Sequence, residues 1–252
     1  MARTVGDLAL MLTAIAKPDR RSPLSHVARP SFDGELAGTL KGVRIGWCPT
    51  LGNLPLEPDV IAVLTQARDQ LGALGCVVTD LELDLSRADE AFETLRALRY
   101  ARAFGAELAT LRQQAKQTVV WNIERGLALD GPAIAHAIAL RSEVFVTVAD
   151  ALERFDLLVA PSAQVVPFPA EEEYPTEIAG VKMPHYLGWM RVCSRLTVSA
   201  HPIAAVPAGF TAQGLPVGMQ LVGRYADDRR LLELAAAWEL AAGLTERHPP
   251  LD

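Results

Sequence analysis

The chain has 252 residues, half of them apolar, which is enough to bury the core of one α/β domain or of two small domains. Its net charge is −6, and its 24 lysines and arginines form no stripe, which argues against nucleic acid or an anionic membrane surface as the partner. No uncharged apolar stretch approaches the ~20 residues that cross a bilayer. The widely separated Cys48, Cys76 and Cys193 are typical of a reducing cytoplasm, and no cysteine or histidine spacing suggests a metal site.

The N-terminal third predicts a helix, a loop and a β-α-β unit, in that order. Apolar residues recur at helical spacing over residues 4–16, and a polar, proline-rich loop follows over 17–36. Residues 43–47 predict a strand, 59–74 a helix that stops at a glycine, and 76–83 a second strand. A unit of this kind implies two parallel strands joined by a helical crossover.

The middle of the chain predicts helices, then a strand, then a long irregular segment. Residues 87–155 contain few breakers, and Asp130 followed by Gly-Pro predicts a capped helix start. Residues 155–160 are apolar except for Asp156 and are followed by a proline, which predicts a strand. Five prolines and three consecutive glutamates lie within 161–190, and loops of this length are usually functional or mobile.

The C-terminal part predicts a hairpin between two helices. A short helix is expected over 191–200, two apolar runs over 204–210 and 217–223 predict antiparallel strands, and a last helix covers 227–242. Together these elements predict the α/β class: a mixed β-sheet flanked by helices in a single domain, residues 1–252.

The sequence contains no self-evident catalytic nucleophile. None of the eight serines stands in a G-x-S-x-G turn, and residues 46–52 lack the glycine spacing of a nucleotide loop. Cys193 with His185 or His201 is a conceivable nucleophile and base, but we favour a small apolar role for Cys193 in a half-buried helix.

The segment 174–193 is the predicted pocket wall, because it combines aromatic rings with a few polar groups just before the last strands. We predict substrate binding by Tyr186, Trp189, Met190 and Arg191. The alternative is that these side chains only pack beneath a loop.

The C-terminal run HPIAAVPAGFTAQGLPVGMQLVGRYADDRRLLELAAAWE resembles the C-terminal portion of the amidase signature family. The residues that carry the resemblance are Pro202, Pro207, Gly209, Gly214-Leu215-Pro216, Gly218, Gln220, Gly223 and Asp227-Asp228. The segments ARTVGDLALML, LKGVRIGW and FDLLVAPSAQVVPF resemble other parts of the family in the same order, so the likeness covers nearly the whole chain.

The resemblance implies hydrolysis of carboxamide C–N bonds without a metal or an organic cofactor. The family's mechanism uses a serine nucleophile, a second serine on a cis peptide and a lysine base. In relatives those residues precede the helix that 4–16 resembles, and the four lysines here, at positions 17, 41, 116 and 182, do not match the catalytic one. We therefore assign no catalytic residue and expect the triad outside this chain. Gln220 is expected to support the site by orienting neighbouring loops rather than to contact substrate.

The predicted function is thus an amidase-family hydrolase of a small-molecule amide in the cytoplasm. The alternative is a non-catalytic, truncated or degenerate amidase-like protein that binds a small ligand or a partner chain. The glutamine amidotransferase branch ranks lower, because its aspartate near Met190 and its Asn-Leu-x-Gly run at 197–200 are missing. The expected protein partner is a second copy in a homodimer or a missing N-terminal portion.

Overall fold

The fold is built on a five-stranded mixed sheet, seen in a computed structural model that describes residues 1–22 and 32–245. The strand order is β2-β1-β3-β7-β6, in which β1 pairs in parallel with β2 and β3, and β7 pairs antiparallel with β3 and β6. The strands are β1 (Arg44–Trp47), β2 (Val77–Asp80), β3 (Leu157–Pro161), β6 (Ile203–Phe210) and β7 (Pro216–Val222). The predicted fold class, a mixed sheet flanked by helices, is confirmed. Residues 23–31 of the predicted N-terminal loop lie outside the described residues.

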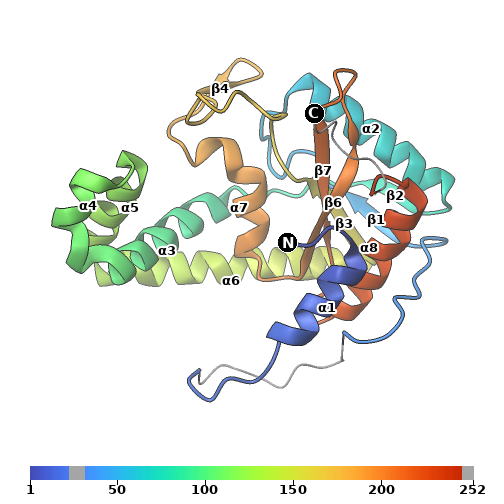
Figure 1. The fold of residues 1–252 in the computed structure, drawn as a ribbon, viewed down its shortest axis with the longest axis horizontal. Helices are drawn as coiled ribbons and strands as arrows, with labels where there is room; N and C mark the ends of the chain where they lie inside the picture. Colours follow the sequence, from blue (N-terminus) through green and yellow to red (C-terminus); the bar gives the residue numbers. More distant parts are fainter. Residues whose placement is uncertain (23–31, 246–252) are drawn as a thin grey trace, which may run out of the picture.

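Helices cover both faces of this sheet (Figure 1). The core on one face includes side chains from α1 (Val5–Ile15), α2 (Pro58–Ala73) and α8 (Asp228–Ala242). The core on the other face includes side chains from α3 (Arg87–Phe104), α6 (Gly131–Arg154) and α7 (Arg191–Val198). The smaller elements are η1 (Gly105–Glu107), α4 (Leu108–Gln114), α5 (Gln117–Leu127), β4 (Glu177–Ile178), β5 (Val181–Lys182) and η2 (Gly188–Met190).

The central strand β3 shows why its sequence is continuously apolar. Leu157 and Val159 join the core beneath α2 and α8, whereas Leu158 and Ala160 join the core beneath α3 and α6. Successive side chains of a strand point to opposite faces, so a strand covered on both faces needs apolar residues at every position.

The predicted β-α-β unit is present, because β1 and β2 pair in parallel with α2 between them in sequence. The second strand is shorter than the predicted range 76–83 and ends at Asp80. The reason lies in its edge position: β2 pairs only with β1, and β1 ends at Trp47, the partner of Asp80.

Two predicted helices begin with a capping side chain, at Thr4 and, as expected, at Asp130. Thr4 Oγ1 accepts a hydrogen bond from the Asp7 backbone N–H at 3.1 Å, and Asp130 Oδ1 accepts one from Ala133 at 2.8 Å. The predicted irregular segment 161–190 contains only the two-residue strands β4 and β5 and the turn η2.

Helix α6 is long and apolar enough to cross a membrane by length and composition, and it is the one such helix in the described part of the chain. It carries Arg141 and Glu143 near its middle, and it packs against α3 beneath the sheet (Figure 1). Its residues Val144 and Val148 are buried in the same core as α3 and α7. Since 22% of its apolar window is buried, this packing covers part of the helix's apolar surface.

An ion pair joins the starts of two neighbouring strands and predicts an acid-sensitive stability. Asp156 accepts hydrogen bonds from Arg44 Nη2 at 2.7 Å and Nε at 3.1 Å, and these bonds are the main reason that the pKa of Asp156 falls to about 2. A lowered pKa stabilises the fold above the carboxyl's ordinary pKa, and that contribution is lost as the pH falls through the folded value.

We expect Asp156→Asn to cost about 1 kcal/mol at pH 7, a figure reduced for the solvent exposure of both partners. The cost should shrink between about pH 4 and about pH 2, where the wild type loses the same contribution. Urea unfolding of the wild type and of Asp156→Asn at pH 7 and at pH 2.5 measures this difference in the free energy of unfolding. An unchanged difference between the two pH values would contradict this assignment.

Candidate functional site

The candidate site is organised by a buried amide at the junction of β3, β7 and α7. Gln220 lies on β7 opposite Ala160, and its side chain is 6% exposed. Its Nε2 donates to the Pro161 carbonyl at 2.7 Å and to the Val192 carbonyl at 3.3 Å. The amide therefore links the end of the central strand to the first turn of α7.

A second glutamine, which was not predicted from the sequence, completes this junction. Gln164 is fully buried, and its Oε1 accepts from the Val192 N–H at 3.3 Å while its Nε2 donates to the Pro55 carbonyl at 3.2 Å. The two glutamine amides together bind both backbone polar groups of Val192. The signal was the same as for Gln220, an amide within an apolar run, since Gln164 interrupts VAPSAQVVPF.

A cavity of about 280 Å³ lies beside this junction. Ser162, just after β3, and Gly218 on β7 line it, and Phe168 and Trp189 line it with rings packed edge to face at 5.5 Å. A Cβ at Gly218 would lie 2.6 Å from Ser162 Oγ, so a larger residue there would displace the serine. The cavity combines a hydroxyl with aromatic walls, as small-molecule sites commonly do.

The four predicted binding residues point into different surroundings. Trp189 lines the cavity. Tyr186 lies instead against α5, where its hydroxyl accepts a hydrogen bond from Asn122 Nδ2 and its ring meets Trp121 edge-on at 5.8 Å. Arg191 faces α3, and Met190 is half-buried at the end of η2. The structure thus brings one of the four, Trp189, to the wall of this cavity.

Helix α7 is fixed to α3 by a buried arginine that was also not predicted from the sequence. Arg195 is 4% exposed and forms a two-pronged pair with Asp89, with Nε–Oδ1 at 2.9 Å and Nη2–Oδ2 at 2.7 Å. Its Nη1 donates to the carbonyls of Leu51 at 2.6 Å and Gly52 at 3.2 Å. Arg191 Nε lies 3.2 Å from the same carboxylate, an ionic contact without the alignment of a hydrogen bond.

A second carboxylate on α3, that of Glu93, binds side chains from the loop before η2 and from α5. Glu93 lies 3.2 Å from His185 Nε2 and accepts a hydrogen bond from Arg125 Nη1 at 3.0 Å. Trp121 packs against both of these partners of Glu93, with the Arg125 guanidinium 4.6 Å from its ring centroid and the His185 ring at 5.4 Å. This cluster anchors the predicted pocket wall to the helices.

These groups do not form a nucleophile and base within the part of the chain that the structure describes. Cys193 Sγ donates to the Ser162 carbonyl at 2.8 Å, and burial raises the pKa of this thiol, so it stays protonated. His185 is held by Glu93, and His201 stacks on Phe145 at 4.8 Å. The geometry agrees with the interpretation of Cys193 as a small packing residue. Over residues 1–22 and 32–245, no group of three or more His, Cys, Asp and Glu side chains is arranged so that it could hold a metal ion.

The chain enters β6 through an alanine in the left-handed region, which offers a test of the local backbone. Ala200 has φ +58°, a conformation that costs an L-residue roughly 1 kcal/mol and glycine almost nothing. We expect Ala200→Gly to raise the free energy of unfolding by about 0.5 kcal/mol. The matched control is Ala62→Gly on the exposed face of α2, which should lower it by about 1 kcal/mol. Equal losses in the two variants, measured by urea unfolding, would refute a strained Ala200.

Similarity to known proteins decides the family. The model of the Amidase family matches residues 1–232. The chain belongs to the amidase family. It is similar to an acylamidase of Rhodococcus erythropolis, with 28% identity in an alignment 256 positions long that covers 99% of this chain and 53% of the relative. It is also similar to a glutamyl-tRNA(Gln) amidotransferase subunit of Chloroflexus aurantiacus, with 29% identity over 98% of this chain and 54% of that protein.

Solved structures of the same family share the fold. A bacterial aryl acylamidase of the amidase signature family superposes with a TM-score of 0.85 and 25% identity, over 98% of this chain and 55% of that one. A 6-aminohexanoate cyclic dimer hydrolase gives 0.81 and 22% identity, over 99% of this chain and 55% of the other, which shows a common fold. The amidase resemblance seen in the sequence is confirmed, and the chain spans about half the length of the relatives it matches.

Proposed function

We propose that this chain forms the C-terminal part of an amidase that hydrolyses the C–N bond of a small-molecule carboxamide. The observation that carries the proposal is the family match over residues 1–232, which includes both the helix α1 and the Gln220 hairpin. In the proposed enzyme the serine nucleophile, the cis-peptide serine and the lysine come from residues outside these 252. The described residues offer the wall of the site rather than its reactive groups.

The proposed part of this chain in the reaction is to shape the acyl pocket. Trp189 and Phe168 give an aromatic wall that suits an apolar or aryl acyl group, and the Gln220 amide fixes the turn at Pro161 beside it. Tyr186 accepts a hydrogen bond from Asn122, so its own hydroxyl proton is left to donate to a substrate carbonyl. Met190 and Arg191 are also proposed to bind substrate, and an ionic contact with Asp89 holds the Arg191 guanidinium in position.

The choice of a small amide over a misacylated tRNA rests on two departures from the amidotransferase pattern. Met190 stands where that branch carries an aspartate, and residues 197–200 read TVSA in place of Asn-Leu-x-Gly. The acylamidase and aryl acylamidase relatives favour the same choice. The cytoplasm is the proposed compartment, since all three cysteines are unpaired thiols.

The test is a polypeptide in which this chain is preceded by its upstream coding sequence, assayed on aryl and alkyl amides. We expect the longer protein to hydrolyse 4-nitroacetanilide and to lose at least 10³-fold of this activity when its nucleophilic serine becomes alanine. We expect no hydrolysis by the 252-residue chain. Trp189→Ala should raise KM for the aryl amide more than for acetamide. If the longer protein cleaves no amide in the panel, the proposal fails.

A second candidate is a non-catalytic member that binds a small ligand or a partner chain. It is favoured by the lack of a nucleophile and base in the described residues and by the edge position of the eight-residue strand β6. An unpaired strand edge is a template for association with another chain. Native mass spectrometry of the 252-residue chain separates a homodimer or a complex with an added N-terminal portion from a stable monomer, which would weaken this candidate.

A further inference from the structure

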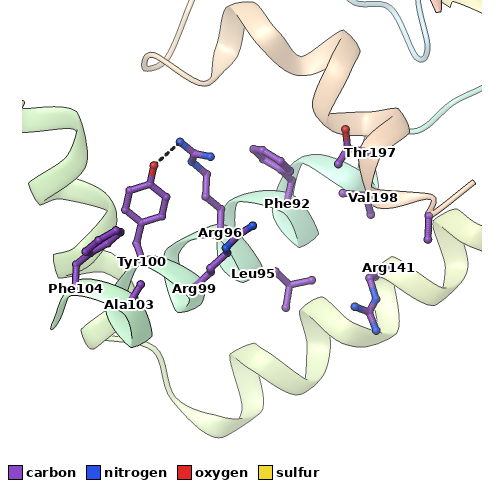
Figure 2. A pocket seen from close by; sticks show the side chains of 11 residues that line it. Phe92, Leu95, Arg96, Arg99, Tyr100, Ala103, Phe104, Arg141, Thr197 and Val198 are labelled. Carbon is purple, nitrogen blue, oxygen red and sulfur yellow. Dashed lines mark hydrogen bonds between the residues drawn. The ribbon is translucent and has the colours of Figure 1, made fainter. Parts of the chain in front are cut away.

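A larger cavity, of about 710 Å³, opens between α3, α6 and α7 (Figure 2). It shares no lining residue with the cavity beside Trp189. Its lining residues are Phe92, Leu95, Arg96, Arg99, Tyr100, Ala103, Phe104, Arg141, Thr197, Val198 and Ala200. Pockets for small molecules usually enclose about 300–1,000 Å³, so a compact organic ligand fits its size.

The charge of this cavity is one-sided. Arg96 and Arg99 reach it from α3 and Arg141 from α6, while no aspartate or glutamate lines it (Figure 2). None of the three arginines forms an ion pair with a carboxylate within residues 1–22 and 32–245. Three guanidiniums without a carboxylate partner thus border one cavity, and they would attract a bound anion. The chain as a whole has a net charge of −6, so this is a local positive site on an acidic protein.

One of the arginines is held in place before any ligand arrives. Arg96 Nη2 donates to the Tyr100 hydroxyl at 3.0 Å, and its guanidinium lies 4.8 Å from the Tyr100 ring centroid and 5.9 Å from that of Phe92. Its Nε is buried without a hydrogen-bond partner in the described structure. A fixed guanidinium loses little conformational entropy when a planar ring stacks against it.

The rest of the cavity wall is apolar and partly aromatic, which favours a ligand with a flat, apolar body. Phe92, Leu95, Phe104 and Val198 supply carbon surface between the cationic groups. Phe104 meets Tyr100 edge-on at 5.9 Å, so the far end of the cavity is aromatic. Aromatic rings and arginine planes favour a planar aromatic partner, and a guanidinium binds a carboxylate with two parallel hydrogen bonds.

We propose that the cavity between α3, α6 and α7 is a binding site for a small aromatic carboxylate. The carboxylate pairs with Arg99 and Arg141, and the ring system lies against Phe92, Tyr100 and the Arg96 guanidinium. This binding needs no hydrolysis and no residue outside the chain, so its test is independent of the proposed amidase activity.

The test is calorimetric titration of the 252-residue chain with 2-naphthoate, and with 2-naphthamide as the neutral match. We expect one saturable site for the carboxylate and at least tenfold weaker binding of the amide. Arg99→Gln and Arg141→Gln should each raise Kd about five- to tenfold, and the double variant should raise it further. Both side chains are exposed, so the variants should keep the melting temperature of the wild type.

The matched control is Arg102→Gln, an exposed arginine on the same helix that does not line the cavity. Its Kd should equal that of the wild type, and 0.5 M NaCl should weaken the wild-type affinity. The proposal is wrong if 2-naphthoate does not bind, if the amide binds equally well, or if Arg102→Gln weakens binding as much as the cavity variants do. Binding of inorganic phosphate as tight as that of 2-naphthoate would overturn the aromatic part of the ligand.

Discussion

Replacement of Gln220 by leucine is expected to lower the free energy of unfolding by about 2–4 kcal/mol, with no substrate present. The leucine cannot make the two hydrogen bonds that Gln220 Nε2 donates at this buried junction, to the Pro161 carbonyl at 2.7 Å and to the Val192 carbonyl at 3.3 Å. The Pro161 carbonyl left without this donor costs about 1–3 kcal/mol, the lost bond to Val192 adds about 1 kcal/mol, and the hydrophobic gain from leucine offsets part of the loss.

The measurement is thermal and urea unfolding of the variant beside Gln213→Leu. Gln213 is an exposed glutamine in the turn of the same hairpin, and its replacement should change the stability by less than about 0.5 kcal/mol. For a chain of this size the Gln220→Leu loss corresponds to a fall in Tm of roughly 5–15 °C. Equal melting temperatures for the two variants would mean that the amide does not hold the junction.

The elements could be predicted from the sequence wherever periodicity or a breaker marked them. The apolar run 155–160, the glycine after 59–74 and Asp130 all have local causes, and the structure contains the corresponding strand, helix end and cap. The extent of β2 could not be predicted, because it depends on the length of its neighbour β1.

The surroundings of each predicted site residue could not be read from the sequence, because its contacts are not local in sequence. Trp189 and Arg191 are two residues apart, and in helical backbone two residues differ by about 200–240° in direction, so the two side chains face opposite sides. One lines the cavity with Phe168, and the other reaches α3. The composition of a segment identified a useful region, but it could not assign each side chain to a pocket.

Arg195 was missed for the same reason. Its partner Asp89 lies 106 residues earlier in the chain, and neither residue stands in a recognisable motif. Only the packing of α7 against α3 brings the two together, and it also carries Arg195 to the carbonyls of the Leu51 turn. A buried arginine cannot be distinguished from a surface one by its sequence neighbours alone.

Arg195→Met is therefore the variant with the largest expected loss, about 3–5 kcal/mol in the free energy of unfolding. The substitution keeps much of the side-chain volume. It leaves the Asp89 carboxylate with the ionic contact to Arg191 but without the two hydrogen bonds from Arg195, and it removes the donor to the carbonyls of Leu51 and Gly52. The matched control is Arg112→Met. Arg112 also binds one carboxylate through two nitrogens, that of Glu124, but both side chains are about half exposed, so the loss should stay below about 1 kcal/mol.

A double-mutant cycle separates the two parts of the Arg195 effect. If the ion pair dominates, Asp89→Leu combined with Arg195→Met should be less destabilising than the sum of the single variants by about 1–3 kcal/mol, since no uncompensated carboxylate remains. The loss that persists in the double variant then measures the contribution of the two carbonyl contacts. Arg195→Lys keeps the charge but not the two-pronged geometry, so it should fall between wild type and Arg195→Met, and it extends the series if the methionine variant does not fold. Additive single losses in urea unfolding would show that Asp89 and Arg195 are not coupled, and the link between α3 and α7 would then rest on the apolar core alone.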